Sequence, residues 1–487
     1  MDGEIDSQLI KKRSLVGVIS LISRSFLVQI ISQASLLLLT IFLDPKTFGV
    51  FFLVSAFISF FTYFSDIGLA AALIQKKEKL SEEDLKTTFL VQESLVLILL
   101  IVIYLVSPLV RRWYNLDQKA IFLLYSLGIS FFLSSLKTIP SILLERELKF
   151  NLLIIPQISE TLVFNLISVF LAWKGFGITS FTWAVLCRSV VGFILIYLVS
   201  PWRPALAFSS TSLAKLLKFG IPYQANTFMA VVKDDLMTIF LGKVIGSTGL
   251  GYLGWAKKWA EQPLRFFMDN VSKVAFPTFS RLQDDKQRLK ISVEKSLFFL
   301  SFLTFPILTG FSLLASDLVK VIPRYLKWQP ALLALYLYSF NSAWATVSTS
   351  MTNLLNAIGK IKTTFKLMIM WLILTWILIP IGGFKLGFNG VAMAAAIISF
   401  SSLVAIIVAK RQVNFDLSNT VGKPLLASFL MGITMYLGRI TIGNLLVSLG
   451  FRILIGFFSY LLFSYLLIGR LLFDDIAKIY HEIRKNR

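Results

Sequence analysis

The chain has almost no cysteine and almost no histidine. Among its 487 residues, Cys187 is the single cysteine and His481 the single histidine. One cysteine cannot form an intramolecular disulfide or a cysteine-based metal cluster. His481 lies in a polar C-terminal tail, which excludes His-based metal sites, Ser-His-Asp catalysis and a buried histidine proton relay. We therefore predict no metal, no bound cofactor and no catalytic residues.

Charged residues are also scarce, at 15% of the chain, whereas hydrophobic residues make up 56%. Soluble globular proteins carry about 25% charged residues, and the mean hydropathy of +0.77 is far above their range. A water-soluble fold is thus excluded. At about 20 apolar residues per membrane span, the chain has room for about a dozen or more transmembrane helices and for no large soluble domain.

Acidic residues are far fewer than basic ones. The 48 Lys and Arg exceed the 26 Asp and Glu, which gives a net charge of +22. Such basicity would indicate nucleic acid in a soluble protein. In membrane proteins, however, Lys and Arg collect in cytoplasmic loops that face anionic lipid. We therefore expect the lipid bilayer, and not nucleic acid, as the partner of these charges.

Hydropathy and loop charge predict an all-α integral membrane protein with about fourteen transmembrane helices. Most bases outside the spans lie in the N-terminus, the even-numbered connections and the C-terminus, which predicts that both termini are cytoplasmic. We expect a multi-pass protein of a bacterial plasma (inner) membrane. The predicted spans cover residues 15–43, 48–75, 87–110, 119–140, 151–172, 178–200, 214–242, 248–279, 290–317, 330–356, 362–384, 387–409, 423–442 and 447–472.

An internal repeat supports this division of the chain. The residues Thr40 to Leu43, followed by Phe48-Gly49, recur as Thr238 to Leu241, followed by Leu250-Gly251. The offset of about 200 residues is typical of duplicated transporter halves. The repeat predicts two six-helix lobes in the same orientation with two further helices appended. The predicted domains are residues 1–210, 211–412 and 413–487.

Several charged residues lie inside the predicted spans. A charge at the centre of a bilayer costs about 2.5–3.5 kcal/mol on insertion scales, so it normally faces protein or a water-filled cavity. The run Lys233-Asp234-Asp235 lies near the middle of its span, where a side chain cannot easily reach an interface. The other charges of this kind in the first lobe are Arg24, Asp66, Glu93, Lys137, Glu160 and Arg188.

The eighth predicted span carries a charge at every fourth residue. Because a helix turns once per 3.6 residues, this spacing drifts only about 40° per step and forms one slowly winding stripe. The stripe is either a salt-bridge ladder against the cytoplasmic surface or one wall of a polar cavity, and the charges in span 7 favour the cavity. Pro263 is expected to bend this helix, as a packing kink or as a conformational hinge. The stripe consists of Lys257, Glu261, Arg265, Asp269 and Lys273.

Three segments resemble a known family. They are Phe60 to Gln75 (FFTYFSDIGLAAALIQ), Leu143 to Phe150 (LLERELKF), and Gly251-Tyr252 through Pro263 to Phe276-Pro277. These residues are similar to the Wzx-type polysaccharide-biosynthesis flippases of the MOP (multidrug/oligosaccharidyl-lipid/polysaccharide) exporter superfamily. The resemblance implies a MATE-like, V-shaped pair of six-helix bundles around a cationic cavity, with two C-terminal helices. It also implies alternating access that moves an undecaprenyl-pyrophosphate-linked oligosaccharide to the outer leaflet.

Such a substrate has an anionic pyrophosphate, a polar glycan and a long apolar tail. Arg and Lys donate charge-assisted hydrogen bonds to phosphate oxygens, so the bases inside the spans are candidate contacts. The acids beside them either carry a coupling ion or neutralise the bases. Coupling to an H⁺ or Na⁺ gradient or to the membrane potential is left open. The candidate pyrophosphate and sugar contacts are Arg24, Lys137, Lys233, Lys257 and Arg265, and the acids are Asp234, Asp235, Glu261 and Asp269.

Other functions remain open at this stage. An ion-coupled multidrug extruder or a lipid II flippase of the same superfamily would share the span pattern, although the bases inside the spans favour an anionic substrate over a cationic drug. A membrane glycan polymerase is disfavoured, because the odd-numbered connections are too short for a catalytic outward loop. We expect a transporter of O-antigen, capsule or exopolysaccharide repeat units and not an enzyme. For this function we expect polysaccharide polymerase and export proteins as partners.

Overall fold

A computed structural model describes residues 28–76, 78–147, 149–438 and 445–469. Within these ranges every regular element is helical, which confirms the all-α prediction. The chain divides into two compact units, Met1–Gly251 and Tyr252–Arg487. The predicted lobe boundaries at residues 210 and 412 remain predictions. In the structure, α9 and α10, which follow residue 210, pack on helices of the first unit.

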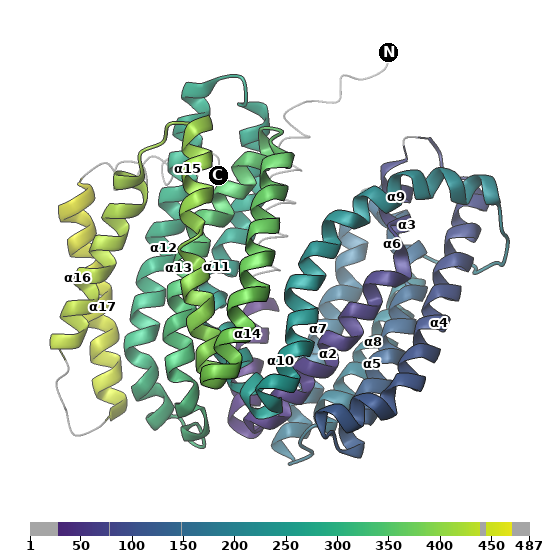
Figure 1. Ribbon diagram of the computed structural model, residues 1–487, viewed down its shortest axis with the longest axis horizontal. Helices are drawn as coiled ribbons and strands as arrows, with labels where there is room; N and C mark the ends of the chain where they lie inside the picture. Colours follow the sequence, from purple (N-terminus) through teal and green to yellow (C-terminus); the bar gives the residue numbers. More distant parts are fainter. Residues whose placement is uncertain (1–27, 77, 148, 439–444, 470–487) are drawn as a thin grey trace. The chain divides into compact units, whose positions relative to one another are not determined.

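The first unit is a bundle of long helices joined by short connections, except for the longer segment 200–209 between α8 and α9 (Figure 1). Helices α4, α5, α7 and α8 pack side by side in the order α4–α5–α8–α7, and α2 packs on both α4 and α5. The elements are a helix over Val28–Phe42, α2 (Pro45–Asp66), α3 (Leu69–Gln75), α4 (Glu82–Tyr114), α5 (Gln118–Leu136), α6 (Thr138–Arg146), α7 (Phe150–Trp173), α8 (Thr179–Val199), α9 (Ser210–Val231), the π-helix η1 (Val232–Leu236) and α10 (Met237–Val244).

The second unit contains the remaining helices. In it α13 packs between α12 and α14, and α16 and α17 form a pair that packs on α12. The elements are α11 (Gly246–Arg281), which begins in the first unit, α12 (Lys286–Val321), the 3₁₀ turn η2 (Leu326–Ala331), α13 (Leu332–Ala357), α14 (Ile361–Ser399), α15 (Ser402–Gln412), the π-helix η3 (Ser418–Gly422), α16 (Lys423–Leu437) and α17 (Leu445–Ile468).

Local sequence explains where several helices begin. Asp44 caps α2 through its bond from the Thr47 N–H, and Pro45 follows at the first helical position. Asp117 caps α5 in the same way. Ser81 and Asp84 form a reciprocal capping box at the start of α4. Each cap satisfies a backbone donor that the first turn leaves without an intrahelical partner.

Predicted spans are interrupted at several points in the structure. The second is broken at Ile67 and Gly68, both of which have positive φ, and the fourth is broken at Lys137. Conversely, α14 joins the eleventh and twelfth predicted spans across a kink at Gly387, where φ is 61° and ψ is −145°. A glycine adopts such angles without the steric cost that a Cβ brings. The twelfth span is interrupted again between α14 and α15.

Nine helical segments in the described part of the chain are long and apolar enough to cross a membrane. The chain is therefore a multi-pass membrane protein, while the count of fourteen spans stays a prediction. The nine segments are Pro45–Asp66, Glu82–Tyr114, Gln118–Arg146, Phe150–Trp173, Thr179–Val199, Lys286–Val321, Ile361–Gln412, Ser418–Leu437 and Leu445–Ile468.

The repeated glycines meet in the first unit. Gly49 of α2 and Gly251 near the start of α11 lie so close to the partner helix that a Cβ at either position would overlap its backbone. The backbone of Ser247 lies over Gly49, and that of Pro45 lies over Gly251. Because only glycine permits this approach, the pair explains why the repeat keeps a glycine at both positions.

Candidate functional site

The run Lys233-Asp234-Asp235 lies in the π-helix between α9 and α10. A π turn is rare within helices and is frequent at functional sites, because its extra residue shifts the direction in which side chains point. The side chains of Lys233 and Asp234 are both exposed, and the Lys233 ammonium lies 3.8 Å from the Asp234 carboxylate. Asp235 instead accepts a 2.8 Å hydrogen bond from the Ser59 hydroxyl of α2. The run thus presents one base and one acid to the surroundings of the unit.

Helix α2 holds this segment in place. The Tyr63 hydroxyl donates to the carbonyl of Gln224 at 2.9 Å, and the Gln224 side-chain amide donates back to the carbonyl of Tyr63 at 2.8 Å. Together with the bond between Ser59 and Asp235, these contacts fix α2 against α9 and η1 at two levels. The position of Lys233 is therefore set by polar bonds between helices as well as by apolar packing.

The charges of the eighth predicted span form an exposed stripe on α11. Glu261 lies between two bases, 3.8 Å from the Lys257 ammonium and 3.1 Å from the Arg265 guanidinium. Lys258 is within electrostatic reach of all three, so the group carries a net positive charge. Asp269 and Lys273 are exposed farther along the helix. The adjacent face, about 100° around the helix, is apolar and buried, and it includes Ala256, Ala260, Leu264 and Met268.

Pro263 does not interrupt this helix. Helix α11 runs from Gly246 to Arg281 as one element, with Pro263 and Pro277 inside it. Proline removes one backbone donor without ending the helix when neighbouring groups compensate. A hinge at Pro263 therefore stays a prediction.

Lys137 lies apart from these residues along the chain, in a charged cluster within the bundle of the first unit. It occupies the break between α5 and α6, and its ammonium lies 2.5 Å from the Glu160 carboxylate of α7. The two side chains are 15% and 25% exposed. Arg188 of α8 is within electrostatic reach of Glu160 and lies over the ring of Phe164, with its guanidinium carbon 5.1 Å from the ring centroid. The charge of Lys137 is thus already balanced by an acid.

Gly192 of α8 makes room for this ion pair. A Cβ at Gly192 would fall on the Glu160 carboxylate, so that carboxylate rests directly against the α8 backbone. Sequence reasoning identified both Lys137 and Glu160 as charges inside spans but not their pairing. Arg24, the remaining candidate base, lies outside the described residues.

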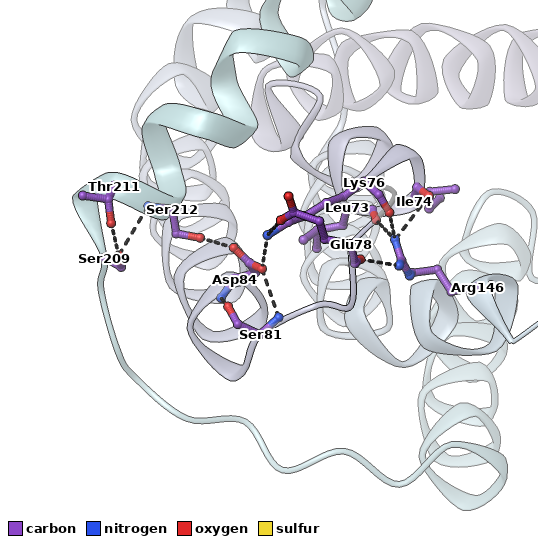
Figure 2. A network of polar contacts seen from close by, with 10 residues as sticks. All are labelled: Leu73, Ile74, Lys76, Glu78, Ser81, Asp84, Arg146, Ser209, Thr211 and Ser212. Carbon is purple, nitrogen blue, oxygen red and sulfur yellow. Dashed lines mark hydrogen bonds and ion pairs between the residues drawn. The ribbon is translucent and has the colours of Figure 1, made fainter.

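A polar network joins three connections of the first unit (Figure 2). Asp84 lies at its centre, 2.6 Å from the Lys76 ammonium at the end of α3. The same carboxylate accepts hydrogen bonds from the Ser81 N–H and from the Ser212 hydroxyl of α9. The network therefore ties the start of α4 to the end of α3 and to the start of α9.

Arg146, at the end of α6, completes this network. Its guanidinium donates to four carbonyl oxygens, at 2.7 Å to Leu73, 3.4 Å to Ile74, 2.6 Å to Lys76 and 2.9 Å to Glu78. These carbonyl groups belong to the last turn of α3 and to the connection after it. Carbonyl groups at the end of a helix have no intrahelical donor. Figure 2 shows the guanidinium pointing into that connection. Arg146 belongs to the segment 143–150 that carries part of the family resemblance.

The second unit contains a buried ion pair that sequence reasoning missed. Arg452 of α17 binds Asp317 of α12, and the Arg452 guanidinium also donates to the carbonyl of Met435 in α16. Arg452 lies within the predicted span 447–472, so a charge inside a span was the signal that could have revealed it. The described residues contain no group of three or more His, Cys, Asp or Glu that could hold a metal ion.

The fold and the charged groups together define a class of protein. The chain is an α-helical, multi-pass membrane protein whose apolar helices enclose ion pairs and whose two units each expose charged residues on a helix. Charges sustained inside membrane helices are typical of transport pathways and of structural ion pairs.

Comparison with known families places the chain more narrowly. Residues 38–331 match the family model described as "Polysaccharide biosynthesis protein". This match covers more than half of the chain, so the chain belongs to the polysaccharide biosynthesis protein family, and the resemblance to Wzx-type flippases of the MOP superfamily is confirmed.

Individual relatives agree with this assignment. The lipopolysaccharide biosynthesis protein WzxC of Escherichia coli (strain K12) is 23% identical over 372 residues, which is 74% of this chain and 73% of that protein. An uncharacterized membrane protein in the cps region of Klebsiella pneumoniae is 24% identical over 379 residues, 76% of each chain. The match with the teichuronic acid biosynthesis protein TuaB of Bacillus subtilis (strain 168), 25% identical, covers half of each chain.

Solved structures show the same fold. The lipid II flippase MurJ in an inward closed conformation has a TM-score of 0.77 at 21% identity, over 94% of this chain and 99% of that chain. An inward-facing multidrug resistance MATE family transporter of the MOP superfamily has a TM-score of 0.60 at 15% identity, over 79% of this chain and 94% of that chain. The predicted MATE-like class of fold is confirmed, whereas the roles assigned to individual residues remain predictions.

Proposed function

We propose that this protein is a flippase that moves an undecaprenyl-pyrophosphate-linked oligosaccharide from the cytoplasmic to the outer leaflet by alternating access. The substrate is a repeat unit of O-antigen, capsule or exopolysaccharide. Membership of the polysaccharide biosynthesis family supports the glycan class. So do relatives named for lipopolysaccharide biosynthesis and, in Rhizobium meliloti (strain 1021), for succinoglycan biosynthesis transport. These names describe biosynthesis and transport, which supports a transporter over an enzyme.

The exposed, positively charged group on α11 is the observation that supports this proposal most directly. Lys257, Lys258 and Arg265 lie around Glu261 on α11, so this group of three bases and one acid has a net positive charge that an anionic head group can use. A cationic drug would be repelled there, which disfavours the multidrug alternative. Guanidinium and ammonium groups supply charge-assisted donors to pyrophosphate oxygens. We assign the pyrophosphate first to Arg265 and Lys257 of α11, and we keep Lys233 of η1 as a separate candidate contact in the first unit.

The remaining candidate residues take secondary places in this proposal. Lys137 is already bound to Glu160, so it contacts substrate only after that pair opens. Glu261 offsets part of the charge of Lys257 and Arg265, and Asp235 accepts a hydrogen bond from Ser59. Asp234 and Asp269 are exposed and remain the candidates for ion coupling among the acids of the predicted site. We further propose cytoplasmic termini and assembly with polysaccharide polymerase or export proteins.

The proposal is tested in cells depleted of this protein. The leaflet of the lipid-linked oligosaccharide is probed with a membrane-impermeant glycosidase. Accumulation of protected, cytoplasm-facing intermediates together with loss of surface polysaccharide supports the flippase. Intermediates that face outward but stay unpolymerised would instead indicate a polymerase, and unchanged intermediates with normal surface glycan would contradict a flippase.

A lipid II substrate is the second candidate. The probable lipid II flippase MurJ of Thermotoga maritima is 26% identical over 253 residues, half of each chain, and the MurJ fold covers 94% of this chain. Analysis of the glycan on the accumulated lipid separates the two substrates. A peptide-bearing cell-wall precursor would replace the oligosaccharide proposed here.

A further inference from the structure

Glu93 of α4 is a carboxyl group inside the first unit with too few hydrogen-bond donors for an ionised carboxylate. The residue is 8% exposed, and its Oε1 has no hydrogen-bond partner in the described part of the chain. Its Oε2 is 2.9 Å from the hydroxyl of Ser135 in α5. A buried carboxylate is normally paired or accepts several hydrogen bonds, because an isolated charge in an apolar interior is very costly.

The Ser135 hydroxyl cannot serve an ionised Glu93 fully. Its oxygen lies 2.9 Å from Glu93 Oε2 and 2.7 Å from the carbonyl oxygen of Phe132, and both of these atoms are acceptors when Glu93 is ionised. A hydroxyl carries one proton and donates one hydrogen bond. A protonated Glu93 removes the conflict, because its O–H donates to Ser135 while Ser135 donates to Phe132. The geometry therefore fits the neutral acid.

Among the residues that the structure describes, no base pairs with Glu93. In the same ranges Ser135 is the one side chain that contacts Glu93 through a polar group, and Tyr197 of α8 is a titratable group within electrostatic reach. The packing of α4 against α3, α6 and α9 is apolar. Leu85 and Phe89 of α4 belong to one buried hydrophobic cluster with residues of those helices. Within the described ranges, the charged residues on the elements around α4 form no ion pair or hydrogen bond with Glu93; they are Lys46 and Asp66 of α2, Lys76 after α3, Lys119 of α5, Lys137 between α5 and α6, Glu145 and Arg146 of α6, Arg188 of α8, Lys215 and Lys218 of α9, and Lys243 of α10.

Glu160 provides the contrast within the same bundle. It accepts the Lys137 ammonium at 2.5 Å and lies within reach of Arg188, so it has basic partners. Two glutamates of one bundle, on α4 and α7, thus differ in their surroundings. Glu93 is a carboxyl group in apolar surroundings with a single hydroxyl contact. It can therefore take up and release a proton without first breaking an ion pair.

The break between α5 and α6 lies at this carboxyl. Ser135 occupies the last turn of α5, and the Tyr197 hydroxyl donates to the carbonyl of Leu136 at 3.0 Å. On the other side of the break, the Gln92 amide of α4 donates to the Thr138 hydroxyl at 2.9 Å. Polar contacts from α4 and α8 thus hold a point where the helix is interrupted. A negative charge on Glu93 acts directly on the Tyr197 hydroxyl, which lies within its electrostatic reach.

We propose that Glu93 is a proton-binding site of the first unit, neutral in the arrangement described here, and that release of its proton destabilises the packing around the α5–α6 break. The proton passes from the Glu93 carboxyl to water when the bundle opens, and it returns when the bundle closes. Its use in coupling rests on the proposed flippase function, and it then links a proton gradient to the conformation of the first unit.

Proton binding is tested without any substrate. The infrared spectrum of the purified full-length protein at neutral pH is compared for wild type, Glu93→Gln and Glu83→Gln, an exposed residue of the same helix. We expect the carbonyl band of a protonated carboxyl in wild type and in Glu83→Gln, and its loss in Glu93→Gln. Glutamine matches the neutral acid in size and can also donate to Ser135, so this variant is expected to fold. Absence of the band in wild type, or its persistence in Glu93→Gln, would overturn the proposal.

Coupling is tested separately in proteoliposomes that contain lipid-linked oligosaccharide. We expect an imposed pH gradient to change the flipping rate of wild type and of Glu83→Gln but not of Glu93→Gln. A Glu93→Gln rate that still follows the gradient overturns the coupling role. Failure of wild type to flip under any gradient would contradict the proposed function, and the infrared result would remain a valid test of the proton site.

Discussion

Lys137 and Arg265 are both bases that the sequence places inside membrane spans, but their contacts differ. Lys137 is largely buried and bound to Glu160. Arg265 is exposed, and it shares the Glu261 carboxylate with Lys257. A paired charge mainly stabilises the bundle, because its removal would leave the partner buried alone. An exposed surplus base is available to an anion. Residue type alone therefore did not separate structural from functional candidates.

Gly192→Ala tests the Lys137–Glu160 pair without removing either charge. The added methyl group would overlap the Glu160 carboxylate and displace it from Lys137. We expect a loss of about 1–3 kcal/mol of stability, as for other disturbed buried networks. Thermal unfolding of the purified protein in detergent measures it. Gly450→Ala in α17, where an added Cβ would meet no described atom within 4 Å, is the matched control, and equal stability of the two variants would refute the overlap.

The sequence located these charged residues but not their partners. Charges inside apolar runs are visible in one chain, so Lys137, Glu160 and Glu93 all stood out. Their pairing depends on the register between helices α4, α5 and α7, which no local pattern encodes. Gly192 gave no signal of its own, because its importance comes from an atom of α7.

At the scale of elements, polar contacts set where helices begin, break and join. The connection between α3 and α4 is held by Asp84 and Arg146, and the pair α16–α17 is held to α12 by Arg452 and Asp317. Most predicted spans have a helix in the structure within a few residues, because hydrophobic length identifies them. The break at Ile67-Gly68 and the π-helix at 232–236 were not predicted. They depend on contacts with other helices, such as the close approach of Gly68 to Gly220.

Arg146→Lys tests the clamp on the α3–α4 connection. A lysine keeps the charge but cannot direct several planar N–H donors at four carbonyl groups. We expect a loss of about 1–3 kcal/mol of stability and faster proteolysis between residues 76 and 81. Arg112→Lys, an exposed base at the end of α4, is the control for the same exchange. Unchanged proteolysis of the Arg146 variant would show that the carbonyl contacts do not hold the connection.

The Arg452–Asp317 pair is tested by a double-mutant cycle. Arg452→Leu or Asp317→Leu alone leaves one buried charge without its partner, which costs about 3–5 kcal/mol. The double variant leaves neither charge, so we expect it to unfold at a higher temperature than either single variant. Additive losses in the double variant would show that the two residues do not stabilise α12 and α17 as a pair.

For the whole molecule, the internal repeat and the family agree. The repeat predicted a duplicated helical protein, and the described chain is all-helical with a MurJ-like fold. The contact between Gly49 and the backbone around Gly251 gives the repeat a physical basis, since both glycines permit close helix packing. The identity of the glycan could not come from sequence patterns, because it depends on a few side chains that recognise sugars.

Transport should depend on the exposed bases. We expect Lys233→Ala and Arg265→Ala each to reduce flipping about tenfold or more, because a hydrogen bond to a charged group contributes about 1.5–3 kcal/mol. Membrane insertion should be unimpaired, since each change removes a charge. Surface polysaccharide in a complemented deletion strain measures the effect, with Arg288→Ala, an exposed base at the start of α12, as the control. Full activity of both single variants and of the double variant would contradict the pyrophosphate assignment.

The most direct test of the central claim is reconstitution. Purified protein is placed in liposomes with a fluorescent lipid-linked oligosaccharide, and a membrane-impermeant quencher reports which leaflet holds the glycan. We predict that the wild type makes the inner pool accessible within minutes, while the Lys233→Ala/Arg265→Ala double variant does so much more slowly. An inner pool that stays protected with wild-type protein under every imposed ion gradient and membrane potential would contradict the account.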